Sequence, residues 1–211
     1  WYSINGNAKE TARLSFFGRV GYDYKSKYLF QFIARYDGSE NFAKGHRWGF
    51  FPSMSAGWII TNEEFMDWSK GFLNYFKIRG SWGQVGNQAI SGYQTQKSYT
   101  SRAYGNHFNA SEKETSLKIT GIANMDLKWE TSNQINAGLD LSFWKGRLAL
   151  TIDAYRKFTE DLLQSKNLPF STGFNIMDVN DGSIQNTGLE FTVDSTPLKI
   201  GEFEWGLTGN L

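Results

Sequence analysis

The fold is decided by RWGFFPSMSAGWII, Arg47 to Ile60, together with KIRGSWGQVGNQ, Lys77 to Gln88. In the first stretch, residues of one parity are large and apolar, and those of the other are small and mostly polar. This period of two indicates a β-strand with two different faces. The strand is longer than usual in globular proteins, and its apolar face carries Trp48 and Trp58 near its ends. Long strands with an apolar face and aromatic ends are typical of transmembrane β-barrels.

The composition of the chain agrees with a sheet protein. Of 211 residues 17% are aromatic, and only 3 are proline, which favours strands over disorder. The net charge of +1 and the lack of a basic stripe argue against nucleic acid as a partner. The absence of cysteine excludes disulfides and thiol chemistry. No apolar run is long enough for a transmembrane helix, whereas alternating strands reconcile a mean hydropathy of -0.48 with a barrel.

About eight strands are predicted along the chain, each with large apolar residues on one face and charged or amide residues on the other. The clearest is 129–143, where Trp129, Ile135 and Leu139 share the apolar face. At about 3.3 Å per residue and a tilt of about 40°, such a strand crosses an apolar band of about 25 Å. Alternation alone also suits a soluble β-sandwich. The predicted strands are 14–24, 28–36, 47–60, 75–82, 129–143, 148–157, 189–194 and 203–211.

The connections between these strands alternate in length. Long, irregular loops are predicted at 37–47, 85–127 and 161–183. The short set comprises turns at Lys25–Lys27, Trp144–Arg147 and Pro197–Gly201, and one or two helical turns in 61–72 that begin with the capping box Thr61–Glu64. Up-and-down strands place all long loops at one rim, which outer-membrane barrels turn to the outside of the cell. The sequence therefore predicts an all-β, antiparallel, up-and-down transmembrane β-barrel segment.

No enzyme, cofactor site or metal site is expected. The two histidines, His46 and His107, lie in predicted loops without further ligands nearby. The segment Asp178–Gly182 fails the EF-hand spacing, because setting its glycine at position six puts Met177 first and Gly188 twelfth. There is no GxGxxG and no GxSxG, so neither a phosphate cradle nor a serine nucleophile is predicted.

Two groups of residues are candidates for function. Charged residues on the polar strand faces would line a wet lumen, where they either pair with other wall or plug residues or guide a substrate. Aromatic residues in the long 85–127 loop either stack on sugar rings or pack the loop on itself. The candidate lumen residues are Arg19, Arg35, Lys77, Arg79, Asp140, Asp153, Glu190 and Asp194, and the candidate loop contacts are Tyr93, Tyr99, Tyr104 and Phe108.

Four stretches resemble the barrel of SusC/RagA-type TonB-dependent transporters of Bacteroidetes, in the order of that family. They are RLSFFGRVGYDYKSKYLF (13–30), DGSENFAKGHRWGFFPSMSAGW (37–58), KIRGSWGQVGNQ (77–88) and LKWETSNQINAGLDLSFWKGRLALTIDAYRKFTEDLL (127–163). The resemblance implies that 1–211 is part of a 22-stranded outer-membrane barrel. The rest of the barrel and an N-terminal plug would belong to a longer protein. It also places Trp48, Phe50, Met54 and Trp58 against lipid and Ser53, Ser55 and Gly57 beside the plug.

The resemblance further implies function and partners. The whole protein would be an active importer of glycans or peptides in the bacterial outer membrane, without catalysis. Its partners would be outer-membrane lipid, a SusD-like lipoprotein lid, and the TonB complex, contacted through the plug. A passive porin-like barrel or adhesin is the second hypothesis, and a soluble β-sandwich binding or hydrolase domain is the third.

Overall fold

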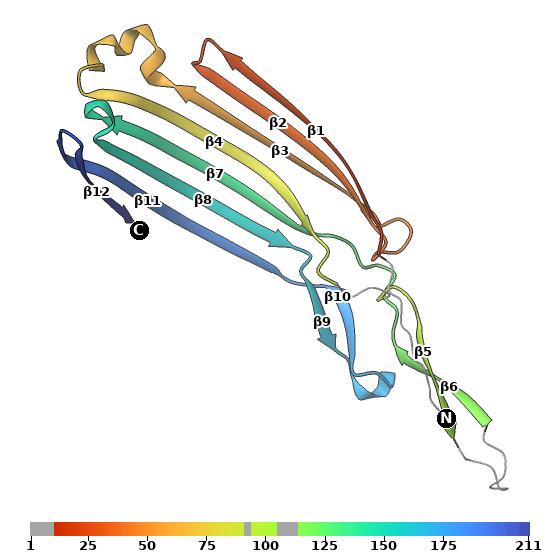
Figure 1. Ribbon diagram of the computed structural model, residues 1–211. Coiled ribbons are helices and arrows are strands. Elements are labelled where there is room, and N and C mark those ends of the chain that lie inside the picture. The colour runs from red at the N-terminus through yellow and green to blue at the C-terminus, as the bar shows by residue number, and fades with distance from the viewer. Residues whose placement is uncertain (1–10, 91–93, 105–113) are drawn as a thin grey trace.

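The computed structural model describes residues 11–90, 94–104 and 114–211. Within these ranges an eight-stranded antiparallel sheet dominates, with the order β1-β2-β3-β4-β7-β8-β11-β12 (Figure 1). Neighbours in this sheet are also neighbours in the sequence, once two inserted hairpins are set aside, so the predicted up-and-down topology is confirmed. The strands are β1 (Arg13–Tyr24), β2 (Tyr28–Ser39), β3 (Trp48–Ile59), β4 (Leu73–Asn87), β7 (Glu130–Phe143), β8 (Leu148–Glu160), β11 (Ser183–Ile200) and β12 (Phe203–Asn210).

The strand register keeps apolar side chains on one face of the sheet. Met54 in β3 lies opposite Phe32 in β2 and Trp82 in β4. Further along, Leu139 in β7 lies opposite Ile78 in β4 and Ile152 in β8. Because side chains of paired residues point to the same side, these residues form one continuous apolar face. Much of this face is exposed in the structure, as a lipid-facing surface requires.

Stacked aromatic rings lie at two levels of the apolar face. Near the rim with the long loops, the ring of Trp48 lies 4.7 Å from that of Tyr36. Near the opposite rim, the ring of Tyr28 lies 6.2 Å from that of Trp58 and 6.4 Å from that of Tyr24. Trp48 and Trp58 start and nearly end the same strand. At about 3.3 Å per residue and a tilt of about 40°, their separation is about 25 Å along the membrane normal, the height of the apolar band of a barrel.

Two hairpins extend from the long-loop end of the sheet, where irregular loops were predicted (Figure 1). They consist of β5 (Ser98–Tyr104) with β6 (Glu114–Gly121), and β9 (Leu163–Asn167) with β10 (Ile176–Asn180). Asn180 ties the two insertions together. Its amide accepts from Lys128 N at 2.9 Å and donates to the carbonyls of Lys128 and Asp161.

The predicted helical turns in 61–72 are present, but the predicted capping box and the predicted Pro197–Gly201 turn are wrong. The 61–72 segment forms two 3₁₀-helices, η1 (Ile60–Asn62) and η2 (Glu64–Ser69), and neither has a side-chain cap. The hydroxyl of Thr61 accepts from Phe76 N at 3.2 Å instead, so the capping box does not form. The predicted Pro197–Gly201 turn is largely strand, because β11 continues to Ile200 through a bulge between Ser195 and Leu198.

No helix among the described residues is both long and apolar enough to cross a membrane.

Candidate functional site

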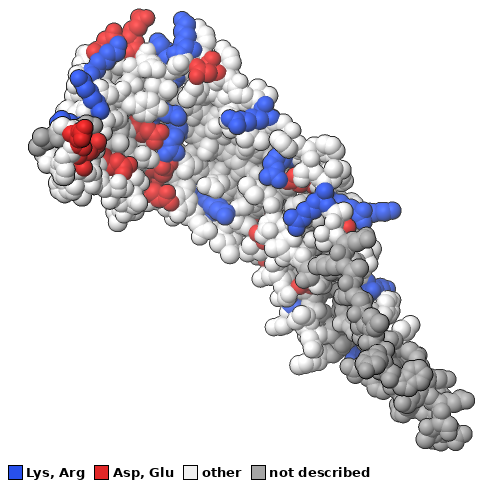
Figure 2. Space-filling model, in the orientation of Figure 1, with Lys and Arg blue, Asp and Glu red and all other residues white. Residues whose placement is uncertain are grey.

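The second face of the sheet is polar and carries all eight candidate lumen residues. Lys77 lies opposite Asp140, and Asp153 lies opposite Glu190, so their side chains point to one side. In the view of Figure 2, most of the acidic side chains lie in the half of the sheet away from the inserted hairpins. On this polar face are Arg19, Arg35, Lys77, Arg79, Asp140, Asp153, Glu190 and Asp194.

Arg79 in β4 links three strands of the polar face. Its Nε lies 3.1 Å from Oδ2 of Asp140 in β7, and its Nη2 lies 2.6 Å from Oδ2 of Asp153 in β8. To reach β8 the guanidinium passes over Gly138, where a Cβ would lie 2.5 Å from Arg79 Cζ. A residue with a side chain would therefore block the bridge. These partly buried, charge-assisted bonds fix the relative positions of β4, β7 and β8.

The other candidate lumen residues differ in how they are paired. Arg35 Nη2 lies 2.9 Å from Asp37 Oδ2, and Asp194 accepts from the Thr208 hydroxyl at 2.7 Å. Arg19, Lys77 and Glu190 make no ion pair within the described residues. Cross-strand pairing thus accounts for part of the set.

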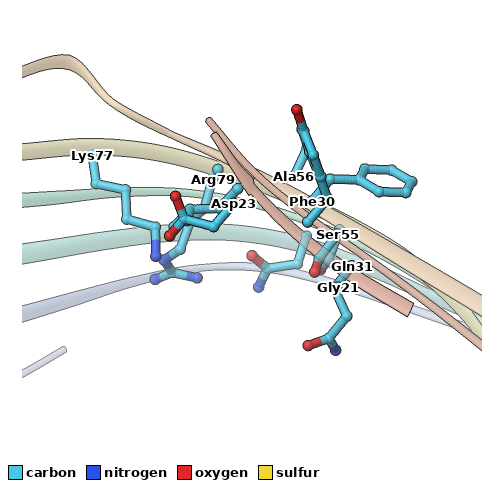
Figure 3. Close-up of a pocket in the computed structure, with 14 residues that line it drawn as sticks. Gly21, Asp23, Phe30, Gln31, Ser55, Ala56, Lys77 and Arg79 are labelled. Carbon is cyan, nitrogen blue, oxygen red and sulfur yellow. The ribbon is translucent and has the colours of Figure 1, made fainter. Parts of the chain in front are cut away.

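Two hollows lie along the middle of the polar face. The first, of about 550 Å³, is shown in Figure 3; Gln31, Ser55, Lys77 and Arg79 line it, while the ring of Phe30 points away. The second, of about 410 Å³, lies nearer the long loops and has Phe51 in its wall. Hydroxyl, amide and charged groups therefore converge in shallow depressions along a face whose opposite side is apolar. Within the described residues no group of His, Asp and Glu is arranged as a metal site.

An aromatic cluster, in which Phe42 and Phe51 are buried and Trp129 is half-buried, closes the polar face at its long-loop end. The ring of Phe51 lies 5.4 Å from that of Trp129, which in turn lies 5.3 Å from the ring of Phe42. Phe51 is 6% exposed and Phe42 is fully buried. Trp129 was predicted on the lipid face; it packs instead against Phe51 on the polar side and donates to Arg47 O at 3.1 Å.

Glycine makes room for this cluster. A Cβ at Gly86 would lie 2.0 Å from Phe51 Cζ, and a Cβ at Gly49 would lie 2.4 Å from the same atom. Gly49 belongs to the stretch Arg47–Ile60, and Gly86 belongs to the stretch Lys77–Gln88. The two glycines thus leave room between them for the Phe51 ring. The spacing of apolar residues gave no sign of this contact, because Phe51 stands at a polar position of the alternation.

The candidate loop aromatics are only partly within the described region. Tyr99 lies in β5 with 56% of its surface exposed, and Tyr104 ends the same strand. Tyr93 and Phe108 lie outside the described residues. Both the sugar-stacking and the self-packing roles of these residues stay predictions.

A hydrogen-bonded cluster at the opposite rim was also missed by the sequence reasoning. The carboxylate of Glu63, between η1 and η2, lies 2.9 Å from Lys27 Nζ and accepts from Tyr28 Oη at 2.8 Å and Trp58 Nε1 at 3.1 Å. The Lys27 bond is the main reason that the pKa of Glu63 falls to about 2, with the Tyr28 and Trp58 bonds adding to it. Glu63 therefore joins the β1–β2 turn to the β3–β4 connection.

These features define a class of protein: the wall of a large antiparallel β-barrel, with an apolar face, a polar face and long loops at one rim. The family model described as TonB dependent receptor-like, beta-barrel matches residues 2–211. The chain belongs to this family. TonB-dependent receptors are barrels of the outer membrane, which confirms the predicted localisation.

Relatives of known name agree with the predicted SusC/RagA type. TonB-dependent receptor P3 of Formosa agariphila is 39% identical over 201 residues, covering 95% of this chain and 20% of the relative. TonB-dependent receptor SusC of Bacteroides thetaiotaomicron is 36% identical over 212 residues, covering 97% and 20%. The structure of the RagAB peptide importer in its closed-closed state matches with a TM-score of 0.86 at 29% identity, covering 96% of this chain and 22% of that one. The chain thus spans about a fifth of the length of these relatives.

Proposed function

We propose that the whole protein is a TonB-dependent active importer of nutrient oligomers, glycans or peptides, and that residues 1–211 form part of its barrel wall. The observation that supports this most is the family match along nearly the whole chain, combined with a sheet that is apolar on one face and polar on the other. A plug elsewhere in the polypeptide would lie against the polar face and carry the contact to TonB. A SusD-like lipoprotein would cover the rim with the long loops, and the protein would carry out no catalysis.

The transport proposal can be tested in the native bacterium by measuring uptake of labelled oligosaccharides and oligopeptides. The strains compared are the wild type, a deletion of the whole gene, and a strain without TonB. We expect uptake of one substrate class to fall to the level of the gene deletion when TonB is absent. Uptake that persists without TonB but disappears with the gene would instead identify a passive, porin-like barrel.

A further inference from the structure

A third hollow of the polar face lies at the long-loop end of the wall, beside the Phe51 cluster. It has a volume of about 330 Å³ and receives residues from β1, β2, the end of β4, and the segment before β7. Its polar lining is dense, and one aromatic side chain borders it. Its lining includes Arg13, Arg35, Asp37, Asn87, Gln88 and Trp129.

Asp37 is the central residue of this hollow. It is only 8% exposed, and it lines both this hollow and the neighbouring one of about 410 Å³. Its Oδ2 accepts from Arg35 Nη2 at 2.9 Å, whereas its buried Oδ1 has no donor within the described residues. A buried carboxylate oxygen without a donor costs free energy. Rotation about the χ2 torsion of an aspartate is soft, so the carboxylate can turn this oxygen toward a donor in the hollow.

The groups around Asp37 set the chemistry of that donor. With the Gln88 amide turned so that its oxygen faces the guanidinium, this oxygen accepts from Arg13 Nε at 2.6 Å. Arg35 keeps further N–H groups beyond its bond to Asp37. The Asn87 amide donates to Glu130 Oε1 at 3.1 Å, which leaves its oxygen as an acceptor. A ligand must therefore donate to Asp37 and Asn87 and accept from guanidinium groups within one small space.

Hydroxyl groups meet this requirement best. A hydroxyl both donates and accepts at a single atom, whereas an ammonium only donates and a carboxylate only accepts. The two guanidinium groups also disfavour an ammonium near Asp37. A peptide amide donates from its N–H group and accepts at its C=O group, and these two groups point in opposite directions. Trp129 adds an apolar border against which the C–H face of a sugar ring can pack.

We propose that this hollow is a carbohydrate subsite at the extracellular mouth of the importer, with Asp37 as its main hydrogen-bond acceptor. The inference rests on the proposed function for its place on the import path, but it concerns binding alone. It assigns glycans, rather than peptides, as the ligand class.

The test is direct binding to the purified full-length protein in detergent. The probes are an array of neutral and acidic oligosaccharides and, separately, a random pentapeptide library. We expect the wild type to bind members of the glycan array and Asp37→Asn to bind them at least about tenfold more weakly, because one charge-assisted hydrogen bond is lost. Arg13→Gln, a change at an exposed residue, should weaken the same ligands. Asp67→Asn at the opposite rim is the matched control and should bind as the wild type does.

Each other outcome has a definite meaning. Heat-modifiable migration on gels shows whether each variant has folded. If Asp37→Asn does not fold, glycan binding by Arg13→Gln decides whether the hollow is a subsite. Binding of peptides alone, or wild-type glycan affinity in the folded variants, would overturn the subsite. TonB-dependent uptake that is unaffected by Asp37→Asn would do the same while leaving the transport proposal intact.

Discussion

At the scale of single residues, glycines decide where a side chain can lie over a neighbouring strand. Gly138 and Gly86 stand where the side chain of a neighbour occupies the place of a Cβ: Arg79 in one case and Phe51 in the other. Gly18, by contrast, has no atom within 4 Å of such a Cβ. The first two glycines are therefore needed for packing, and the third is not.

Replacing Gly138 by alanine should destabilise the barrel by about 1–3 kcal/mol, the usual cost of overpacking a filled site. The new methyl would force Arg79 away from Asp153 and break the three-strand bridge. The measurement is urea unfolding of the full-length protein in lipid vesicles. Gly18→Ala serves as the control and should change the free energy of unfolding little; equal effects at both sites would contradict the packing argument.

Leu139 tests which face meets lipid. Since it lies among Ile78 and Ile152 in the middle of the apolar face, Leu139→Arg should cost about 2–4 kcal/mol in a bilayer. Gln134→Leu, on the polar face of the same strand, should cost much less. If the same unfolding measurement gave a large loss for Gln134→Leu and none for Leu139→Arg, the two faces would have to be exchanged.

At the scale of elements, alternation predicted the eight wall strands and their faces, because a period of two is a local property of the chain. The alternating lengths of the connections predicted the order of the strands. Alternation did not predict the hairpins β5–β6 and β9–β10, whose strands show little apolar alternation and are held by pairing to each other. It also missed Glu63 and Asp37, whose roles depend on partners from other elements. Trp129 was predicted on the wrong face because the period of two was extended to include it, although the strand begins one residue later, at Glu130.

Glu63 provides a pH-dependent test at the level of turns. Its carboxylate has a pKa of about 2 in the folded protein against 4.5 ordinarily, so the ionised form is favoured by folding. The ionised Glu63 carboxylate therefore contributes fully to the free energy of unfolding above a pH of about 4.5. This contribution is lost as the pH falls through about 2. Glu63→Gln should therefore lower the urea midpoint at pH 7, and the difference from the wild type should shrink across that interval.

Glu64→Gln is the matched control, since this neighbouring carboxylate makes no hydrogen bond or ion pair within the described residues. It should shift the midpoint little at any pH. A pH-independent difference for Glu63→Gln would show that the carboxylate contributes through its shape rather than its charge.

At the scale of the whole molecule, the two aromatic levels predict how the wall sits in the membrane. Trp48 and Trp58 mark opposite edges of the apolar band, whereas Trp129 is held in the Phe51 cluster on the polar side. In single-tryptophan variants of the full-length protein, brominated lipids should quench Trp48 and Trp58 strongly and Trp129 weakly. Strong quenching of Trp129 would place the Phe51 cluster in lipid and contradict the assigned lumen.

The sequential strand order also bears on the speed of folding. Three pairs in the sheet close through turns of two to four residues, whereas β4 must find β7 across segment 88–129, the longest connection in the sheet. Closing that segment costs about 2 kcal/mol more than closing the 25–27 turn if both behave as flexible chain, from the logarithmic dependence on loop length. The β5–β6 hairpin pairs locally within the segment and shortens the span that must be searched. The joining of β4 to β7 is therefore the step at which folding of the wall should be slowest.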